Sequence, residues 1–88
     1  MPIYHHSYMS RLILKVEQKR LQALLREVRQ EAGLRQIDLA KRLGQPQSFI
    51  SKCESGERRL DLPELRQVCK AIGISLKKFV ERFEDSHK

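Results

Sequence analysis

Four glycines punctuate the chain, and each follows a stretch in which apolar residues recur with the spacing of an amphipathic helix. These glycines are Gly33, Gly44, Gly56 and Gly73. The alternation of apolar and polar residues that indicates a β-strand does not compete with this pattern outside residues 1–9. The sequence therefore predicts five helices and an all-α fold.

The length and composition favour one small globular domain. The 88 residues are 40% hydrophobic and 33% charged, which is too apolar for a disordered tail. No run of about eighteen apolar residues indicates a membrane span, and the sequence opens with no export signal, so we expect a cytoplasmic protein without a membrane partner. Cys53 and Cys69 lie within helical apolar patterns and are expected to be small core residues in a reducing compartment.

Residues 1–17 are predicted to form an N-terminal arm or extension, either partly disordered or extending the first helix, before a helix-turn-helix domain over residues 18–88. The segment Met1–Met9 has no helical period, and its adjacent His5 and His6 are accompanied by no Cys or carboxylate cluster. We therefore expect a flexible arm or a tag-like remnant, and no metal site. The first helix begins either near residue 10 or near residue 18, and the sequence leaves both possibilities open.

Two short helices joined by a tight turn form the most informative part of the sequence. They are predicted over 36–43 and 47–55. Ala40 and Ile50 fall where the two helices touch, and a small residue there allows a close and steep crossing. Gly44 supplies the positive φ that the turn requires. The sequence therefore predicts a helix-turn-helix at about residues 36–55.

The fourth and fifth helices carry their own start signals. Asp61 and Glu64 have the spacing of a capping box, with Pro63 in the first turn. Ser75 is placed to cap the last helix. The fourth helix is therefore expected to begin directly after Asp61, and the fifth directly after Ser75.

Positive charge is concentrated in the middle of the chain. The formal net charge is +7, and residues 18–60 hold ten basic and five acidic side chains, which gives five of the seven units. This balance suits a polyanion, although many basic proteins bind none. The outer face of the helix over 47–55 has no carboxylate before Glu54 and is therefore able to approach phosphates.

The stretch from Gln36 to Gly44, followed by the run Ser-Lys-Cys-Glu-Ser-Gly-Glu at residues 51–57, resembles the Cro and lambda-repressor-like helix-turn-helix group, also called the Xre family. The resemblance covers about residues 18–83. It implies a five-helix lambda-repressor-like DNA-binding domain that acts without a cofactor. Members of this family are usually homodimeric transcription regulators, so the resemblance implies a sequence-specific regulator of double-stranded DNA, expected to be a repressor and nucleoid-associated when bound.

The resemblance also implies a role for each matching residue. Taken alone, Gln47 and Lys52 would be ordinary surface residues, and the surrounding motif makes them candidates for base contacts. The residues that match the base-reading face are Gln47, Ser48, Ser51 and Lys52. Those expected to contact phosphates are Gln36, Ser55, Arg58 and Arg59. Those expected to support the helix-turn-helix are Ala40, Gly44, Ile50, Arg29 and Glu54, with Arg29 pairing to Glu54 to orient the recognition helix.

Three residues depart from the family pattern. Arg35 stands where relatives favour a Ser or Thr cap, so the second helix is expected to start less tightly. Pro46 replaces a second polar cap, although proline suits the first position of a helix. Cys53 replaces a larger aliphatic residue and is expected to loosen the packing beneath the recognition helix.

Apolar residues near the C-terminus raise the question of a dimer. Phe79 and Val80 are expected to fill the core against the first helix. Residues left over would form a dimer patch, for which the candidates are Leu76, Phe79 and Phe83.

Other functions compete with a dedicated regulator. The fold also suits an antitoxin that holds a toxin, a controller protein of a restriction–modification locus, or an adaptor that binds protein instead of DNA. Enzyme activity is not expected, since the sequence has no glycine-rich phosphate loop, no nucleophile elbow and no metal-ligand spacing.

Overall fold

The computed structural model describes residues 8–85, which form five α-helices and no strand. The helices are α1 Tyr8–Glu31, α2 Gln36–Leu43, α3 Gln47–Ser55, α4 Leu62–Ile72 and α5 Leu76–Asp85. The all-α fold with five helices and a helix-turn-helix is thereby confirmed. The prediction for His5 and His6 lies outside the described residues.

The first helix is longer than expected. α1 runs without interruption for 24 residues and begins at Tyr8, so the prediction of a non-helical segment reaching Met9 was wrong for its last two residues. Of the two possible starts, the one near residue 10 is closer to the structure. With a rise of about 1.5 Å per residue, α1 is ~36 Å long, and it dominates the 44 Å long axis of the molecule.

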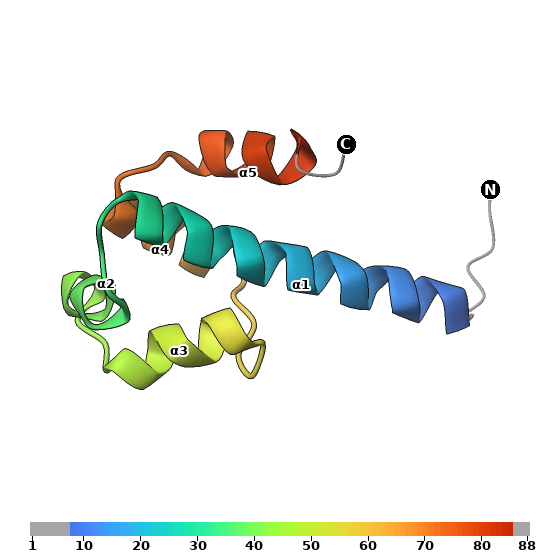
Figure 1. The fold of residues 1–88 in the computed structure, drawn as a ribbon, viewed down its shortest axis with the longest axis horizontal. Helices are drawn as coiled ribbons and strands as arrows, with labels where there is room; N and C mark the ends of the chain where they lie inside the picture. Colours follow the sequence, from blue (N-terminus) through green and yellow to red (C-terminus); the bar gives the residue numbers. More distant parts are fainter. Residues whose placement is uncertain (1–7, 86–88) are drawn as a thin grey trace.

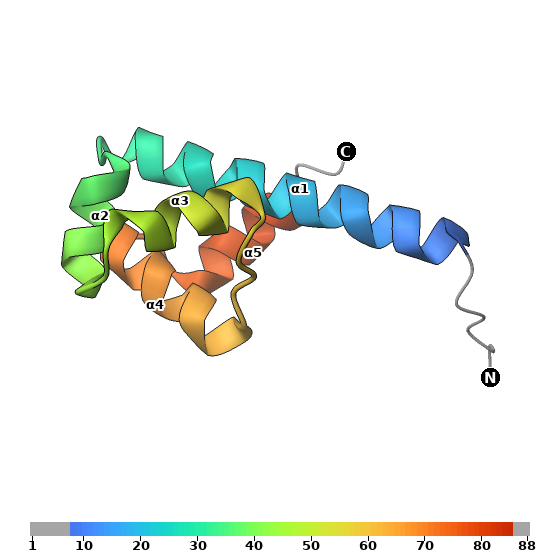
Figure 2. The same cartoon turned by 90° about the horizontal axis from the view of Figure 1, so that it is seen from below.

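The other four helices gather around the second half of α1. α3 and α5 pack against α1, and α2 packs against both α3 and α4 (Figures 1 and 2). They enclose one core, whose largest fully buried side chains are Leu39, Ile50, Val68, Cys69 and Phe79. Cys53 and Cys69 are both buried, as expected. Burial raises the pKa of the Cys69 thiol to about 11.

The predicted start signals of α4 and α5 are confirmed. Asp61 Oδ1 accepts a hydrogen bond from the backbone N–H of Glu64 at 2.8 Å, and Glu64 Oε1 accepts one from the N–H of Asp61 at 2.9 Å. Ser75 Oγ accepts a hydrogen bond from the N–H of Lys78 at 3.0 Å. These bonds satisfy donors at each helix start that have no partner within the helix.

The residues that depart from the family pattern at helix starts behave differently from each other. The N–H of Arg35 donates to Asp38 Oδ2 at 2.9 Å, and the guanidinium of Arg35 pairs with the same carboxylate. Hydrogen bonds from Arg35 lower the pKa of Asp38 to about 2. The start of α2 is therefore held by Asp38 in place of a Ser or Thr cap. Pro46 precedes α3 at the cap position, not at the first helical position, and provides no side-chain hydrogen bond.

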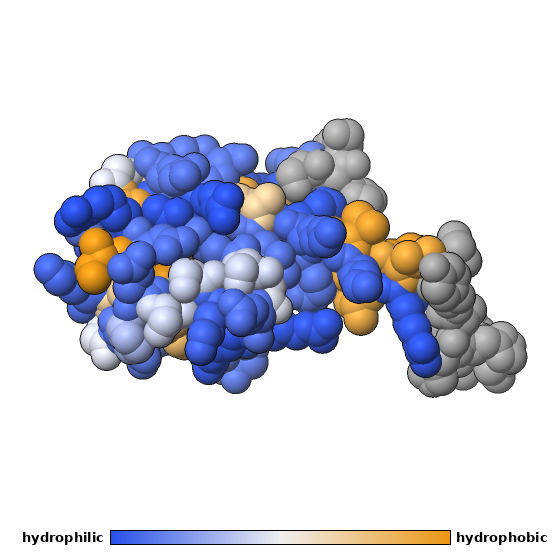
Figure 3. All heavy atoms as spheres, turned by 60° about the horizontal axis from the view of Figure 1, so that its bottom comes forward, coloured by the Kyte–Doolittle hydropathy of each residue, from blue (hydrophilic) through white to orange (hydrophobic). Residues whose placement is uncertain are grey.

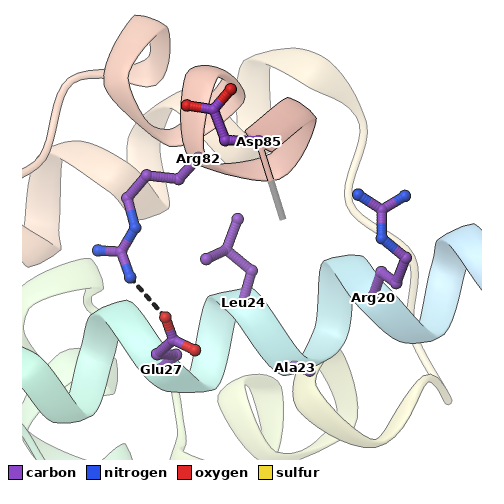
Figure 4. A pocket seen from close by; sticks show the side chains of 6 residues that line it. All are labelled: Arg20, Ala23, Leu24, Glu27, Arg82 and Asp85. Atoms are coloured by element: carbon purple, nitrogen blue, oxygen red, sulfur yellow. Dashed lines mark hydrogen bonds and ion pairs between the residues drawn. The ribbon is translucent and has the colours of Figure 1, made fainter. Parts of the chain in front are cut away.

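The fifth helix corrects two predictions. Phe79 is 1% exposed and belongs to the core, so it was wrongly placed among the dimer candidates, whereas Val80 is 43% exposed and does not fill the core. Leu76 and Phe83 are partly buried against the core. The reason is the orientation of α5 on α1, where Arg82 reaches Glu27 beside Leu24 (Figure 4).

The first half of α1 projects beyond the helical body, as both ribbon views show (Figures 1 and 2). All side chains from residue 10 to residue 16 are exposed. Hydrophobic side chains gather on this projecting part, whereas the body beside it is largely hydrophilic (Figure 3). Within residues 8–85, no helix is both long enough and apolar enough to cross a membrane.

Candidate nucleic-acid interface

The turn between α2 and α3 has the geometry that the sequence predicts. Gly44 adopts a left-handed conformation with φ 66°, and its N–H donates to Lys41 O at 3.1 Å. The N–H of Gln45 donates to Ala40 O at 2.9 Å. Ala40 and Ile50 are each 1% exposed, consistent with close packing of two short helices around one small residue. α3 is thereby fixed with one face on the core and the other in solvent.

The outer face of α3 carries most of the residues expected to read bases. Gln47, Ser48 and Lys52 are exposed, whereas Ser51 is half-buried. The Ser51 hydroxyl donates to Ser48 O at 3.2 Å, and the exposed Ser55 hydroxyl donates to Lys52 O at 3.2 Å. In the free protein the Ser51 and Ser55 hydroxyls thus bond to the backbone of their own helix, and Ser55 Oγ also accepts a hydrogen bond from the N–H of Glu57 at 3.5 Å.

A buried ion pair joins α3 to α1. Arg29 Nε donates to Glu54 Oε2 at 2.6 Å, and Arg29 Nη2 donates to Glu54 Oε1 at 2.9 Å. Arg29 and Glu54 are 6% and 5% exposed. Burial alone would raise the pKa of Glu54, but hydrogen bonds from Arg29 and Gln36 outweigh it and lower the pKa below its usual value.

The carboxylate of Glu54 also accepts a hydrogen bond from a residue nearer the surface. Gln36 Nε2 donates to Glu54 Oε1 at 3.1 Å, and Gln47 Nε2 donates to Gln36 Oε1 at 3.4 Å. A continuous series of polar contacts therefore runs from Arg29 in the core to Gln47 at the start of α3. Its effect is to restrict the rotamers of Gln36 and Gln47 before any ligand is present.

The two loop arginines after α3 occupy different environments. Arg58 is half-buried, pairs with Glu64 Oε2 at 2.7 Å and lies over the ring of Phe49, with 4.8 Å between the guanidinium carbon and the ring centroid. Hydrogen bonds from Arg58 lower the pKa of Glu64 to about 2. Arg59 is exposed. Arg58 therefore connects the end of α3 to the start of α4, and Arg59 is the more accessible of the two for a phosphate.

Positive charge beside Arg59 was not singled out in the sequence. Arg11 and Lys15 of the projecting part of α1 line one hollow with Arg59, together with Leu12 and Leu14. Their spacing of four residues indicates that Arg11 and Lys15 share a side of a helix, but the sequence does not tell that this side lies next to the loop after α3. The positive charge near α3 therefore extends beyond the helix-turn-helix.

Among residues 8–85, no group of three or more His, Cys, Asp and Glu side chains is placed to hold a metal ion. The exposed face of α3 offers amide, hydroxyl and ammonium groups, bordered by the guanidinium of Arg59. Such groups recognise other molecules by hydrogen bonds and charge.

Comparison with known proteins agrees with this geometry. The family model of helix-turn-helix proteins matches residues 25–79, and no curated protein matches the chain. A solved XRE-family like protein from Pseudomonas syringae pv. tomato str. DC3000 is 39% identical, with a TM-score of 0.85; the match covers 93% of this chain and all of that one.

Other solved structures similar to this chain contain the restriction–modification controller protein C.Esp1396I. One is its tetramer in complex with its natural 35 base-pair operator, at 25% identity and a TM-score of 0.73, covering 78% of this chain and 91% of the controller chain. Another is the same protein bound to a 25 base-pair operator site, at 25% identity and a TM-score of 0.71, with the same coverage. With the family model matching well over half of its residues, the chain belongs to the XRE family of helix-turn-helix proteins, a family of DNA-binding transcription regulators.

Proposed function

We propose that this protein is a sequence-specific transcriptional repressor that binds double-stranded DNA as a homodimer. α3 would enter the major groove, because a helix of this kind fits the groove and can present side chains to base edges. The observation that carries the proposal is the exposed polar face of α3, held outward by the buried pair of Arg29 and Glu54.

The side chains of this face divide into two roles. Gln47 can bond to an adenine through its amide, and Lys52 can donate to the acceptors of guanine. Ser48 and Ser51 can add weaker contacts, with Ser51 limited by its half-buried position. These residues would supply sequence preference.

Affinity would come mainly from phosphate contacts, which carry no sequence information. Arg59 is exposed and suited to this role. Ser55 is exposed at the end of α3, and it would contact a phosphate by turning its hydroxyl proton from Lys52 O to the phosphate oxygen. Gln36 keeps one amide N–H available beyond its bond to Glu54. Arg58 would act by positioning the loop, because its guanidinium already contacts Glu64 and Phe49.

Two copies would read two half-sites about one helical turn apart, ~34–36 Å along the duplex. Repression would follow when the bound dimer covers a promoter. A controller protein of a restriction–modification locus is a second candidate, supported by the likeness to C.Esp1396I, which is solved as a tetramer with its operator.

Selection of bound sequences from a random duplex pool tests the proposal directly. We expect an enriched motif with two-fold symmetry and a half-site separation of about one helical turn. Binding to the enriched duplex should fall steeply as salt rises. Failure to enrich any motif, together with salt-insensitive binding, would contradict a role in sequence-specific regulation and favour a protein-binding adaptor.

The gene neighbourhood and reporter experiments separate the two candidates. A repressor should reduce expression from a promoter that carries the selected motif. A controller protein should additionally be encoded beside a restriction endonuclease and a methyltransferase.

A further inference from the structure

One side of α1 carries a row of polar and basic side chains that contains no carboxylate. Residues separated by three, four or seven positions share one side of a helix. The residues that follow this spacing, called here the basic row, are Arg11, Lys15, Lys19, Gln22 and Arg26. The four charged members are exposed, and Gln22 is half-buried. The basic row therefore presents four positive charges along ~22 Å of helix.

The carboxylates of α1 lie on a different side of the helix. Glu17 pairs with Arg20 at 2.8 Å, and Arg20 also donates to a backbone carbonyl of α5. Glu27 and Glu31 both pair with Arg82 of α5. In Figure 1, α5 and α3 lie on opposite sides of α1. The acidic groups of α1 are thus engaged toward α5 and do not neutralise the basic row.

The second half of the basic row borders α3. Arg26 Nε lies 3.4 Å from Glu54 Oε1. A Cβ added to Gly56, the residue that ends α3, would lie only 2.6 Å from Gln22 Nε2, so the end of α3 packs directly against the middle of the row. The basic row therefore lies on the side of α1 that faces α3.

The first half of the basic row borders the loop that follows α3. Arg11 and Lys15 line one hollow with Arg59 of this loop. Leu12 and Leu14 complete the lining. Because Arg59 is a phosphate-contacting residue of the proposed function, the hollow continues the proposed DNA-binding surface onto the projecting part of α1.

The cations of this hollow have charge to spare. Arg11, Lys15 and Arg59 form no ion pair with any other residue that the structure describes. The loop also contains one exposed carboxylate, Glu57, which accepts a hydrogen bond from the Ser55 hydroxyl at 3.3 Å. Three cations against one carboxylate leave the hollow positively charged, which suits a polyanion.

We propose that Arg11 and Lys15 bind the sugar–phosphate backbone of the duplex whose bases face α3. Guanidinium and ammonium groups donate charge-assisted hydrogen bonds to phosphate oxygens. The projecting part of α1 thereby extends the contact with DNA beyond the helix-turn-helix and its loop. It supplies affinity and not sequence preference, because phosphate contacts carry no sequence information. The inference rests on the proposed DNA binding and adds a second element to the surface that performs it.

Arg11→Gln with Lys15→Gln tests the inference in the full chain. This double variant should reduce the slope of log affinity against log salt by ~1.8, as expected for two lost phosphate contacts, and weaken binding at least ~10-fold at 0.1 M salt. The selected and a scrambled duplex should lose affinity equally. Glutamine is a good helix former, and unchanged helicity by circular dichroism checks that α1 remains folded.

Arg66→Gln with Lys70→Gln is the matched control. Arg66 and Lys70 are also an exposed arginine and lysine four residues apart, but they lie on α4, outside the helix-turn-helix. The control removes the same two positive charges and should leave the salt slope nearly unchanged. If it lowers the slope as much as the variant of α1, the effect reflects overall charge and the inference is overturned.

Ethylation interference on the selected duplex locates the contact. An ethylated phosphate has lost its negative charge, so ethylation weakens binding where a cation contacts that phosphate. The variant of α1 should become insensitive to ethylation at phosphates to which the wild type and the control remain sensitive. An interference pattern identical to that of the wild type would overturn the inference. Sedimentation without DNA should be unchanged; a shift toward monomer would show that α1 acts through self-association and would also overturn it.

Failure of the inference is distinguishable from failure of the proposed function. If the wild type selects a DNA motif and the variant of α1 keeps the wild-type salt slope, the inference is wrong and the regulator stands. If the wild type binds no duplex at low salt, the proposed function is wrong and the inference falls with it.

Discussion

Glu54 of α3 and Arg29 of α1 share two hydrogen bonds of 2.6 and 2.9 Å, and each residue is at most 6% exposed. Arg29 also donates to the carbonyl of Leu34 at 2.7 Å, which fixes the loop before α2. One guanidinium therefore sets the orientation of the recognition helix and the path of the chain leading into the helix-turn-helix. Removal of the Arg29 guanidinium should therefore lower the free energy of unfolding.

Arg29→Met should destabilise the protein by about 3–5 kcal/mol, because it leaves the Glu54 carboxylate buried without its main partner. Urea denaturation measures this change. Arg26→Met is the matched control: Arg26 lies 3.4 Å from the same carboxylate, but its side chain is 56% exposed, so we expect a loss of about 1 kcal/mol or less. Adding Glu54→Leu to Arg29→Met should recover part of the loss; a further loss would show that the buried charge is not the cause.

The same pair predicts a specific dependence on pH. The pKa of Glu54 in the folded state is below its ordinary value of 4.5. The stabilisation is therefore complete above the pKa of the unfolded state and is lost as the pH falls through the folded pKa. The difference in unfolding free energy between the wild type and Glu54→Gln should narrow as the pH is lowered below about 4.5. If the difference in unfolding free energy stays constant below pH 4.5, the charge of Glu54 is not its cause.

The sequence predicts the helical elements well because their signals are local. Helix ends marked by glycine, the capping box of Asp61 and the Ser75 cap each depend on a few neighbouring residues. The start of α1 at Tyr8 was missed, since residues 1–9 show no apolar period that would indicate a helix. Local sequence signals therefore predict the helices of the fold, except for the start of α1.

Gly44→Ala should destabilise the protein by about 1–2 kcal/mol, because alanine is strained at φ 66°. An added Cβ at this position meets no heavy atom within 4 Å, so the cost is conformational and not steric. Gly44→Asn should be less harmful, since asparagine tolerates the left-handed conformation better. Chemical denaturation of both variants measures this order. Equal losses for the two would indicate that backbone strain is not the cause.

The candidate site was predictable only in part. The exposed positions of Gln47, Ser48 and Lys52 follow from the helical period once α3 is located. The contact of Arg58 with Glu64 and Phe49 could not be foreseen, because it depends on how the loop after α3 folds back toward α4. Long flexible side chains form contacts with residues of other helices, and a sequence pattern does not predict these contacts.

The two loop arginines should therefore respond differently to substitution. Arg59→Ala should weaken specific and nonspecific DNA binding alike and reduce the slope of log affinity against log salt by about 0.9, as expected for one lost phosphate contact. Arg58→Ala should instead lower the thermal midpoint of the free protein, because it removes the partner of Glu64. Titration at several salt concentrations and thermal unfolding measure the two effects. An unchanged salt slope for Arg59→Ala would remove Arg59 from the phosphate-contacting residues.

Lys52→Ala tests whether the outer face of α3 reads sequence. Lys52 is exposed near the end of α3, so its loss should leave the stability of the free protein within about 0.5 kcal/mol. Binding to the selected duplex should weaken by about 1–3 kcal/mol, the range of a direct base contact, and preference at the contacted base pair should relax. Competition titrations with the selected and a scrambled duplex measure both effects.

Lys70→Ala is the matched control for Lys52→Ala, because Lys70 is also an exposed lysine but lies on α4, outside the helix-turn-helix. It should leave the affinity for both duplexes nearly unchanged, since its charge lies away from the recognition face. If Lys52→Ala weakens the selected and the scrambled duplex equally, Lys52 contacts a phosphate, and sequence preference must come from Gln47 and its neighbours. If neither duplex is affected, the outer face of α3 does not enter the groove at this position.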